Sequence, residues 1–163
     1  MAGTLGVGVI GCGNISSAYF RLSKLFQAIE VKACADLNME IAQAQAKEFG
    51  LEALSVEALL SHSEVDIIVN LTVPNAHFEV SKAILEAGKH VYSEKPLTLS
   101  LEDGLALRDL AQQKGLRVAC TPDTFLGGTH QQARALIDSG VLGKIVGGTC
   151  HVLSHGMEHW HPN

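Results

Sequence analysis

Most of the chain alternates between short apolar runs and longer amphipathic segments. The apolar runs have few polar interruptions, which is typical of strands buried on both faces of a parallel sheet. They predict strands at Leu5–Ile10, Val31–Ala35, Asp66–Leu71, His90–Tyr92 and Arg117–Cys120.

The segments between these runs repeat apolar residues with helical spacing. They predict helices at Ile15–Gln27, Met39–Phe49, Val56–Leu60, Ala76–Ala87, Leu101–Gln113 and Thr129–Asp138. Glycines closely follow four of the helices, as expected of C-terminal stop signals; they are Gly50, Gly88, Gly115 and Gly140. Ser100 precedes two acidic residues at a predicted helix start, so we expect it to be the N-cap.

Strands that alternate with helices at this spacing indicate βαβ units. We therefore predict an α/β fold with a doubly wound parallel sheet in residues 1–126. Beyond this point a further helix is followed by Lys144–Leu153, where apolar and polar residues alternate as in a strand. We interpret residues 127–163 as a connecting helix and the first strand of a second, α+β domain.

Composition and charge narrow the classes of function. Hydrophobic residues make up 47% and charged residues 18% of the 163 positions, which is typical of a soluble globular protein. The net charge of −5 and the lack of a basic run argue against nucleic acid or an anionic membrane as a partner. No apolar stretch reaches the roughly 18 residues of a membrane span.

The N-terminus and the cysteines indicate a cytoplasmic protein. The first residues carry no basic segment and are interrupted by glycines, so we expect no signal peptide. No two cysteines form a CxxC pair, and we expect reduced thiols in place of disulfides or a metal site; the cysteines are Cys12, Cys34, Cys120 and Cys150.

A glycine-rich turn follows the first predicted strand. Gly11–Ser16 reads GCGNIS, a GxGxxS variant of the dinucleotide-binding fingerprint of the Rossmann fold. Gly11 would permit the tight turn, and Gly13 would let the backbone approach a pyrophosphate at the start of the next helix. Ser16 is small enough for close packing of helix and strand. The alternative is a turn that merely needs glycine, but its place between a strand and a helix favours the cofactor site.

An acidic residue ends the second predicted strand. Asp36 lies 20 residues after Ser16, where a carboxylate accepts hydrogen bonds from the adenosine ribose. A carboxylate there repels a 2′-phosphate and no arginine follows closely, so we predict a preference for NAD over NADP. The alternative is that Asp36 caps the next helix, a role that Asn38 could also fill.

Polar loops with prolines follow three further strands. Glu94-Lys95-Pro96 follows His90–Tyr92, Thr72–His77 reads TVPNAH, and residues 121–124 read TPDT. Ligands of open α/β sheets bind beyond the carboxyl ends of the strands, so we expect these loops to meet near the glycine loop.

A lysine at that edge can donate to a substrate hydroxyl or to the nicotinamide ribose. It can also stabilise negative charge that develops on an alcohol oxygen as hydride leaves carbon. Glu94 would orient Lys95 or tune its protonation; the alternative is a surface ion pair of small effect. The candidate catalytic residues are Lys95 and Glu94. The candidate cofactor-binding residues are Gly11, Gly13, Asn14, Ile15, Asp36, Thr72, Pro74, Asn75, His77, Glu94, Lys95, Pro96 and Asp123.

These motifs together resemble the glucose–fructose oxidoreductase / inositol dehydrogenase / MocA family of nicotinamide-dependent oxidoreductases. The resemblance covers nearly the whole chain and rests on "GVGVIGCGNIS", "ACADLN", "VNLTVPNAHFEVSKAILEAGKHVYSEKPLTLSLEDG" and "LIDSGVLGKIVG". It implies a cis peptide bond at Lys95–Pro96. It also implies a C-terminal α+β domain with substrate contacts and an Asp/His pair for acid–base chemistry. This chain stops before such residues, so we expect no turnover from the chain alone.

A histidine-rich segment lies at the end of the chain. It combines His151, His155, His159 and His161 with Glu158, but the spacing matches no zinc motif, and we expect no metal. The resemblance implies that the segment lies at the substrate mouth, with Trp160 near the nicotinamide or substrate.

Two functions from different classes remain. The first is an NAD-dependent dehydrogenase that acts on a sugar, cyclic polyol or related hydroxy compound and forms a homo-oligomer. The second is an NAD-binding sensor or regulatory module without chemistry. The Glu94-Lys95-Pro96 sequence favours the first.

Overall fold

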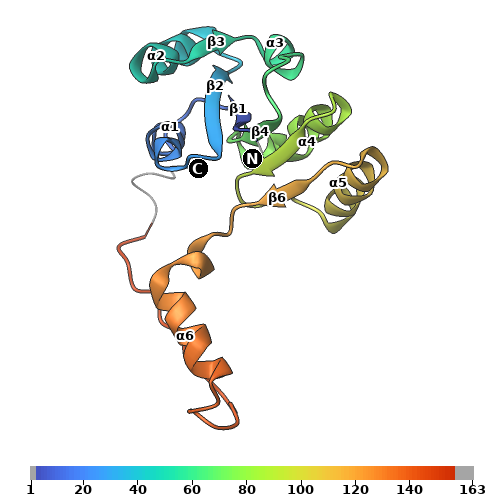
Figure 1. Cartoon of the computed structure of the whole chain (residues 1–163). Coiled ribbons are helices and arrows are strands. Elements are labelled where there is room, and N and C mark those ends of the chain that lie inside the picture. The colour runs from blue at the N-terminus through green and yellow to red at the C-terminus, as the bar shows by residue number, and fades with distance from the viewer. Residues whose placement is uncertain (1–2, 157–163) are drawn as a thin grey trace. The chain divides into compact units, whose positions relative to one another are not determined.

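The computed structural model describes residues 3–156, and the chain divides into two compact units, Met1–Pro122 and Asp123–Asn163. The first unit contains one six-stranded sheet in the order β3-β2-β1-β4-β5-β6, and every neighbouring pair is parallel (Figure 1). Its strands are β1 (Leu5–Ile10), β2 (Ile29–Ala35), β3 (Glu52–Leu54), β4 (Ile67–Asn70), β5 (His90–Ser93) and β6 (Val118–Cys120).

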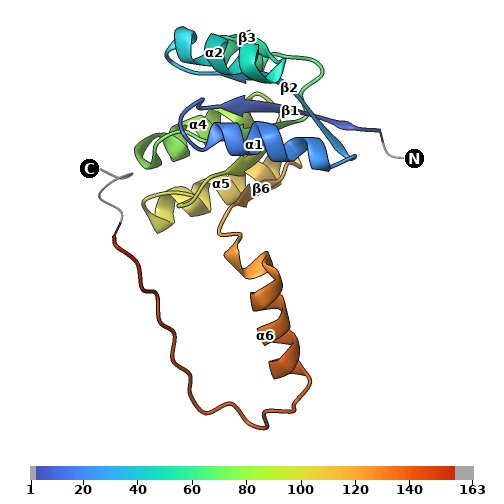
Figure 2. The ribbon, with the colours of Figure 1, turned by 90° about the vertical axis from the view of Figure 1, so that its left-hand side faces the viewer.

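Helices connect the strands and cover both faces of the sheet (Figure 1 and Figure 2). They are α1 (Ser16–Leu22), η1 (Ser23–Leu25), α2 (Met39–Phe49), α3 (Val56–Leu60), η2 (Pro74–Ala76), α4 (His77–Glu86) and α5 (Leu101–Lys114). Two apolar clusters form the core. One packs β-strand residues against Phe20 of α1 and Ala42 of α2. The other packs strand residues against α3, α4 and α5 through Leu59, Ile84 and Leu107. This is the doubly wound α/β architecture that the alternating pattern predicted.

The predicted elements agree closely with the observed ones, because strands buried on both faces and amphipathic helices have different periods. β1, α2 and α3 have the predicted bounds, and the four predicted stop glycines all adopt positive φ. Ser100 caps α5 by accepting a hydrogen bond from the amide of Asp103 at 3.1 Å. The predicted helix Ile15–Gln27 is divided into α1 and η1, and β3 was not predicted.

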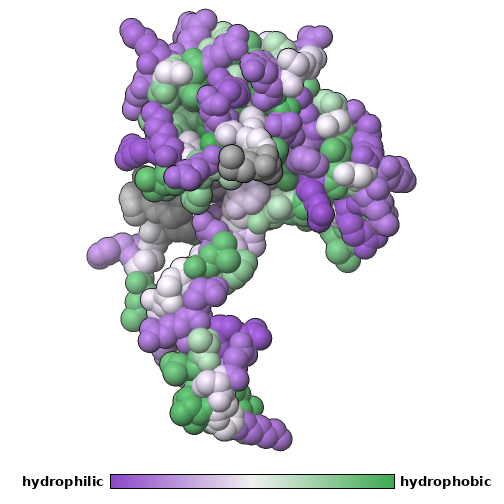
Figure 3. Space-filling view, viewed as in Figure 1, coloured by the Kyte–Doolittle hydropathy of each residue, from purple (hydrophilic) through white to green (hydrophobic). Residues whose placement is uncertain are grey.

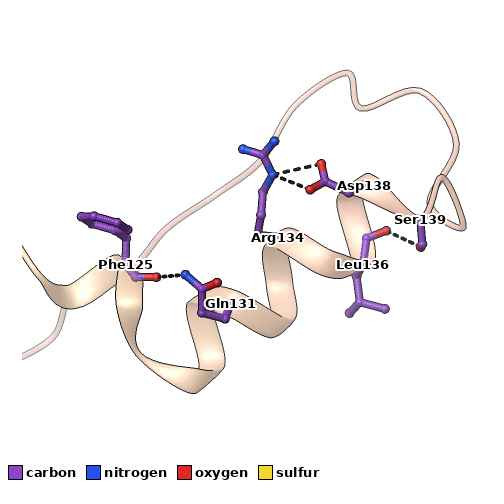
Figure 4. A network of polar contacts seen from close by, with 6 residues as sticks. All are labelled: Phe125, Gln131, Arg134, Leu136, Asp138 and Ser139. Carbon is purple, nitrogen blue, oxygen red and sulfur yellow. Dashed lines mark hydrogen bonds and ion pairs between the residues drawn. The ribbon is translucent and has the colours of Figure 1, made fainter. Parts of the chain in front are cut away.

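The second unit begins with η3 (Thr124–Leu126) and α6 (Gly128–Asp138). Figure 4 shows how side chains tie this segment together: Arg134 pairs with Asp138 one turn later at 2.8 Å, and Gln131 donates to the carbonyl of Phe125 at 2.7 Å. Figure 3 shows hydrophobic residues on the surface of the molecule. In α6, Leu136 and Ile137 are exposed.

The predicted strand Lys144–Leu153 is wrong for this structure. Residues 144–153 form no strand, and three of their apolar side chains are almost fully exposed: Val146 by 92%, Val152 by 88% and Leu153 by 92%. The physical reason is that a strand exists only with a hydrogen-bonded partner, and no described strand pairs with this segment. Among the described residues, no helix is long and apolar enough to cross a membrane.

Candidate active site

Five loops reach one edge of the sheet because all six strands are parallel. They follow β1, β2, β4, β5 and β6 at the strands' carboxyl ends. From β1, the chain adds β2 and then β3 on one side of the sheet, and it adds β4, β5 and β6 on the other side. The order in which strands are added therefore reverses between β1 and β4. Such a switch point is where open α/β sheets bind ligands.

The glycine loop follows β1 at this switch point. Gly11 has φ +99°, and a Cβ added there would lie 2.7 Å from the backbone carbonyl of Leu71 at the end of β4. Glycine is therefore required both by the conformation and by the approach of two chain segments. Ser16 is fully buried, in line with the close packing expected of a small residue here. Its hydroxyl donates to the carbonyl of Gly13 at 2.7 Å.

The same loop presents backbone donors. The amides of Gly13, Asn14 and Ile15 donate to no acceptor within residues 3–156, and the space beside Gly13 is open, with nothing within 4 Å of a built Cβ. Neighbouring free amides beside an open surface fit a pyrophosphate. The residues present thus fit the dinucleotide that the fingerprint predicted.

Asp36 lies at the end of β2 and is held by two backbone amides. Cys12 donates to Oδ2 at 2.8 Å, and Asn38 donates to Oδ1 at 2.9 Å. The cap of α2 is Asn38, whose side chain accepts from the amide of Glu40 at 3.0 Å. The capping alternative for Asp36 is therefore excluded, and its partly exposed carboxylate is fixed beside the glycine loop.

A buried polar network holds the loop after β4. Asn70 is completely buried, and its Nδ2 donates to the carbonyl of His77 at 3.1 Å and to the hydroxyl of Ser81 at 3.0 Å. Its Oδ1 accepts from the Thr72 hydroxyl at 2.6 Å and from the Thr72 amide at 3.2 Å. Pro74 and Asn75 of the same loop are exposed on η2.

His77 joins this loop to the loop after β5. Its Nε2 lies 2.9 Å from the carbonyl oxygen of Thr72, and its Nδ1 lies 2.5 Å from that of Pro96. The side chain is 1% exposed. A direct cofactor contact, which the sequence predicted, would need this ring to become exposed; here it fixes two loops of the site instead.

The Glu94-Lys95-Pro96 loop follows β5, and the Lys95–Pro96 bond is cis, as the family resemblance implied. Lys95 and Pro96 are exposed. Oε2 of Glu94 accepts from the backbone amide of Lys95 at 2.9 Å. The alternative, a surface ion pair between Glu94 and Lys95, does not form among the described residues. The carboxylate therefore orients the lysine through its backbone.

The other Glu94 oxygen, Oε1, accepts from the Tyr19 hydroxyl of α1 at 2.9 Å. Burial raises the pKa of the Tyr19 phenol, and the hydrogen bond to Glu94 raises it further. The phenol therefore stays a protonated donor at neutral pH. Sequence analysis missed Tyr19, because its partner is 75 residues away. It also missed Asn70, although a polar residue at the end of an apolar strand was a usable signal.

The remaining candidates belong to other parts of the chain. Asp123 belongs to the second unit, where it precedes η3, and its role stays a prediction. His159, His161, Glu158 and Trp160 lie outside the described residues. Within residues 3–156 no group of three or more His, Cys, Asp or Glu side chains could hold a metal ion.

The cysteines of the described chain are free thiols, two of them buried beside the glycine loop. A hydrogen bond with Cys34, together with burial, raises the pKa of Cys12. The Cys12 thiol therefore stays protonated. The contribution of Cys12 to the site is its backbone amide, which donates to Asp36.

The parallel sheet, the glycine loop with free amides and the acidic residue after β2 define a dinucleotide-binding domain of the Rossmann class. The chain belongs to the GFO/IDH/MocA oxidoreductase family, whose domain described as "Oxidoreductase family, NAD-binding Rossmann fold" matches residues 5–121. The family predicted from the motifs is thus confirmed.

Curated relatives include two enzymes of known reaction. The chain is 36% identical over 146 residues to a dTDP-3,4-didehydro-2,6-dideoxy-alpha-D-glucose 3-reductase of Streptomyces violaceoruber, covering 86% of this chain and 42% of that protein. It is 31% identical over 143 residues to an inositol 2-dehydrogenase/D-chiro-inositol 3-dehydrogenase of Lactiplantibacillus plantarum, covering 85% and 41%. The chain thus spans less than half the length of these relatives.

Solved structures show the same fold. A 3-ketoreductase from Actinomadura kijaniata, in complex with TDP-benzene and NADP, has a TM-score of 0.79 and 30% identity over 85% of this chain and 44% of its own. An NAD-binding protein from Listeria innocua has a TM-score of 0.80 and 27% identity over 86% and 42%.

Proposed function

We propose that this chain is the cofactor-binding part of a dehydrogenase that transfers a hydride between nicotinamide and a sugar, cyclic polyol or related hydroxy compound. The observation that carries the proposal is the exposed Lys95 beyond β5, held by Glu94 at the sheet edge that also carries the glycine loop. The sugar and inositol chemistry in the names of the two curated relatives supports the substrate class.

Cofactor binding is assigned to groups that are already in place. The amides of Gly13, Asn14 and Ile15 would hold the pyrophosphate, and Asp36 would accept from the adenosine ribose. A 2′-phosphate would face the Asp36 carboxylate with no arginine nearby in the sequence, so we propose NAD over NADP.

When bound, nicotinamide supplies a hydride acceptor or donor for a carbon that carries the reacting oxygen. The role of Lys95 is to donate a hydrogen bond to that oxygen and to stabilise the negative charge that builds on it as the C–H bond breaks. Glu94 keeps the lysine backbone in place. A cytoplasmic location and a homo-oligomeric state belong to the same proposal.

The test compares Lys95→Ala with the parent protein in its native, full-length form. We expect kcat to fall by about 100-fold or more, as when one donor to a developing oxyanion is removed. The Kd for NAD should rise by no more than roughly tenfold, the equivalent of one hydrogen bond. Lys82→Ala is the matched control, because it removes an exposed lysine from α4 and should leave both quantities unchanged.

An unchanged kcat in Lys95→Ala would contradict the catalytic role. Tight NAD binding without turnover of any sugar or polyol would favour the sensor instead. Titration with both cofactors tests the preference: Asp36→Ala should lose NAD affinity and gain relative affinity for NADP, and tighter binding of NADP by the unmodified protein would refute the assignment.

A further inference from the structure

One carboxylate connects the first helix of the fold to the loop that carries the lysine. Glu94 accepts from the Tyr19 hydroxyl through Oε1 and from the Lys95 amide through Oε2, both at 2.9 Å. Tyr19 lies on α1, which begins directly after the glycine loop. Two hydrogen bonds through this carboxylate therefore join α1, the helix that follows the glycine loop, to the backbone of the lysine loop.

Two donors from different parts of the chain hold the Glu94 carboxylate. Oε1 accepts from the Tyr19 hydroxyl and Oε2 accepts from the Lys95 amide, and no ion pair between described residues involves the carboxylate. The backbone of Glu94 is fixed independently, because its amide donates to the carbonyl of Asn70 at 2.9 Å. Loss of the phenol would thus remove the donor to Oε1, loosen the side chain and leave the strand end intact.

A released Glu94 side chain has two alternatives, both of which disturb the lysine. It can turn to water, which leaves the Lys95 amide without its acceptor. It can also pair with the neighbouring ammonium, which draws Lys95 away from a bound substrate. Burial raises the pKa of the Tyr19 phenol, so it is a hydrogen-bond donor to the Glu94 carboxylate at neutral pH. Hydrogen bonds from a hydroxyl to a carboxylate are among the stronger ones in proteins.

We propose that Tyr19 is a positioning residue for Lys95, which acts by fixing the Glu94 carboxylate on the lysine backbone. The proposal rests on the catalytic role proposed for Lys95. It assigns a function in the reaction to a residue of α1 that lies outside the glycine fingerprint and the Glu94-Lys95-Pro96 motif.

The kinetic test uses Tyr19→Phe in the native protein. We expect kcat to fall about tenfold, because small misplacements of a reacting group are costly, and the Kd for NAD to stay within about twofold. Ser17→Ala is the matched control: it removes a hydroxyl and its 3.3 Å hydrogen bond to Gln45 from the same helix, away from Glu94. It should change neither quantity.

A combined variant tests whether Tyr19 acts through the lysine. In a Lys95→Ala background, Tyr19→Phe should lower kcat no further, since the group being positioned is gone. A further tenfold loss would overturn the proposal, because Tyr19 would then act on something else.

A second measurement does not depend on turnover. Solvent exchange of the Lys95 amide, followed by NMR, should become several-fold faster in Tyr19→Phe than in the unmodified protein or in Ser17→Ala. Unchanged exchange would refute the positioning role even if the protein proves to be a dehydrogenase. Faster exchange together with a normal kcat in Lys95→Ala would instead refute the proposed function, on which the role of Tyr19 in catalysis depends.

Discussion

Replacing Asn70 by aspartate hardly changes the shape of the side chain, but it should strongly disturb the hydrogen bonds that hold the loop after β4. Asn70→Asp exchanges the Nδ2 group for a carboxylate oxygen. The carbonyl of His77 then loses its donor and faces an oxygen, whereas the Ser81 hydroxyl can rotate and donate instead. The bonds from Thr72 to Oδ1 remain possible.

The expected loss follows from burial. Leaving one buried carbonyl unsatisfied costs about 1–3 kcal/mol, and placing a charge at a fully buried position adds a comparable or larger penalty. We therefore expect the free energy of unfolding to fall by about 3–5 kcal/mol at pH 7, a large share of the ~5–15 kcal/mol of a typical domain.

The loss in free energy of unfolding caused by Asn70→Asp should depend on pH. Burial raises the pKa of the introduced carboxyl in the folded state above its unfolded value of about 3.9. The folded state then binds more protons than the unfolded state, so stability falls as pH rises between these two values. The protonated acid can also donate to the His77 carbonyl, so the deficit should shrink toward low pH.

Urea denaturation followed by circular dichroism at pH 5, 6 and 7 measures this difference. Asn38→Asp is the control, because Asn38 is an exposed N-cap where aspartate serves equally well; it should lie within about 0.5 kcal/mol of the unmodified protein. A deficit that is equally small in Asn70→Asp, or one that does not vary with pH, would refute the reasoning.

Two further predictions concern the glycine loop and α1. Gly11→Ala should lower the free energy of unfolding by the ~1–2 kcal/mol of a left-handed residue, and further because the new Cβ would lie 2.7 Å from the backbone of Leu71. Gly88→Ala is the control, because Gly88 has φ +81° but open space around it, and it should show only the first loss. Equal losses of the two variants in urea denaturation would contradict the close approach of Gly11 to Leu71. Since the folded pKa of Tyr19 is raised above 10, the free energy of unfolding should decrease as pH rises beyond about 10, and this slope should be smaller in Tyr19→Phe.

Local sequence was sufficient for most elements of the fold and for the cofactor loop. Buried parallel strands and amphipathic helices differ in period, and stop glycines and the Ser100 cap act within one turn of chain. The fingerprint Gly11–Ser16 and the acid at position 36 are likewise read from neighbours in sequence. β3 was missed because it has three residues, one of them charged, and becomes a strand only by pairing with Ala33–Ala35 of β2.

Tertiary structure alone decided which polar groups meet. Sequence allowed either Asp36 or Asn38 to cap α2; the fold gives the cap to Asn38 and turns Asp36 toward the Cys12 amide. Sequence placed Glu94 beside Lys95 but did not show that its carboxylate binds the backbone amide and a tyrosine 75 residues away. Alternation predicted a strand at Lys144–Leu153 that does not form among the described residues. The reason is the same in each case: helix caps and periodicity are local, whereas strand pairing and side-chain networks depend on partners that only the folded chain brings together.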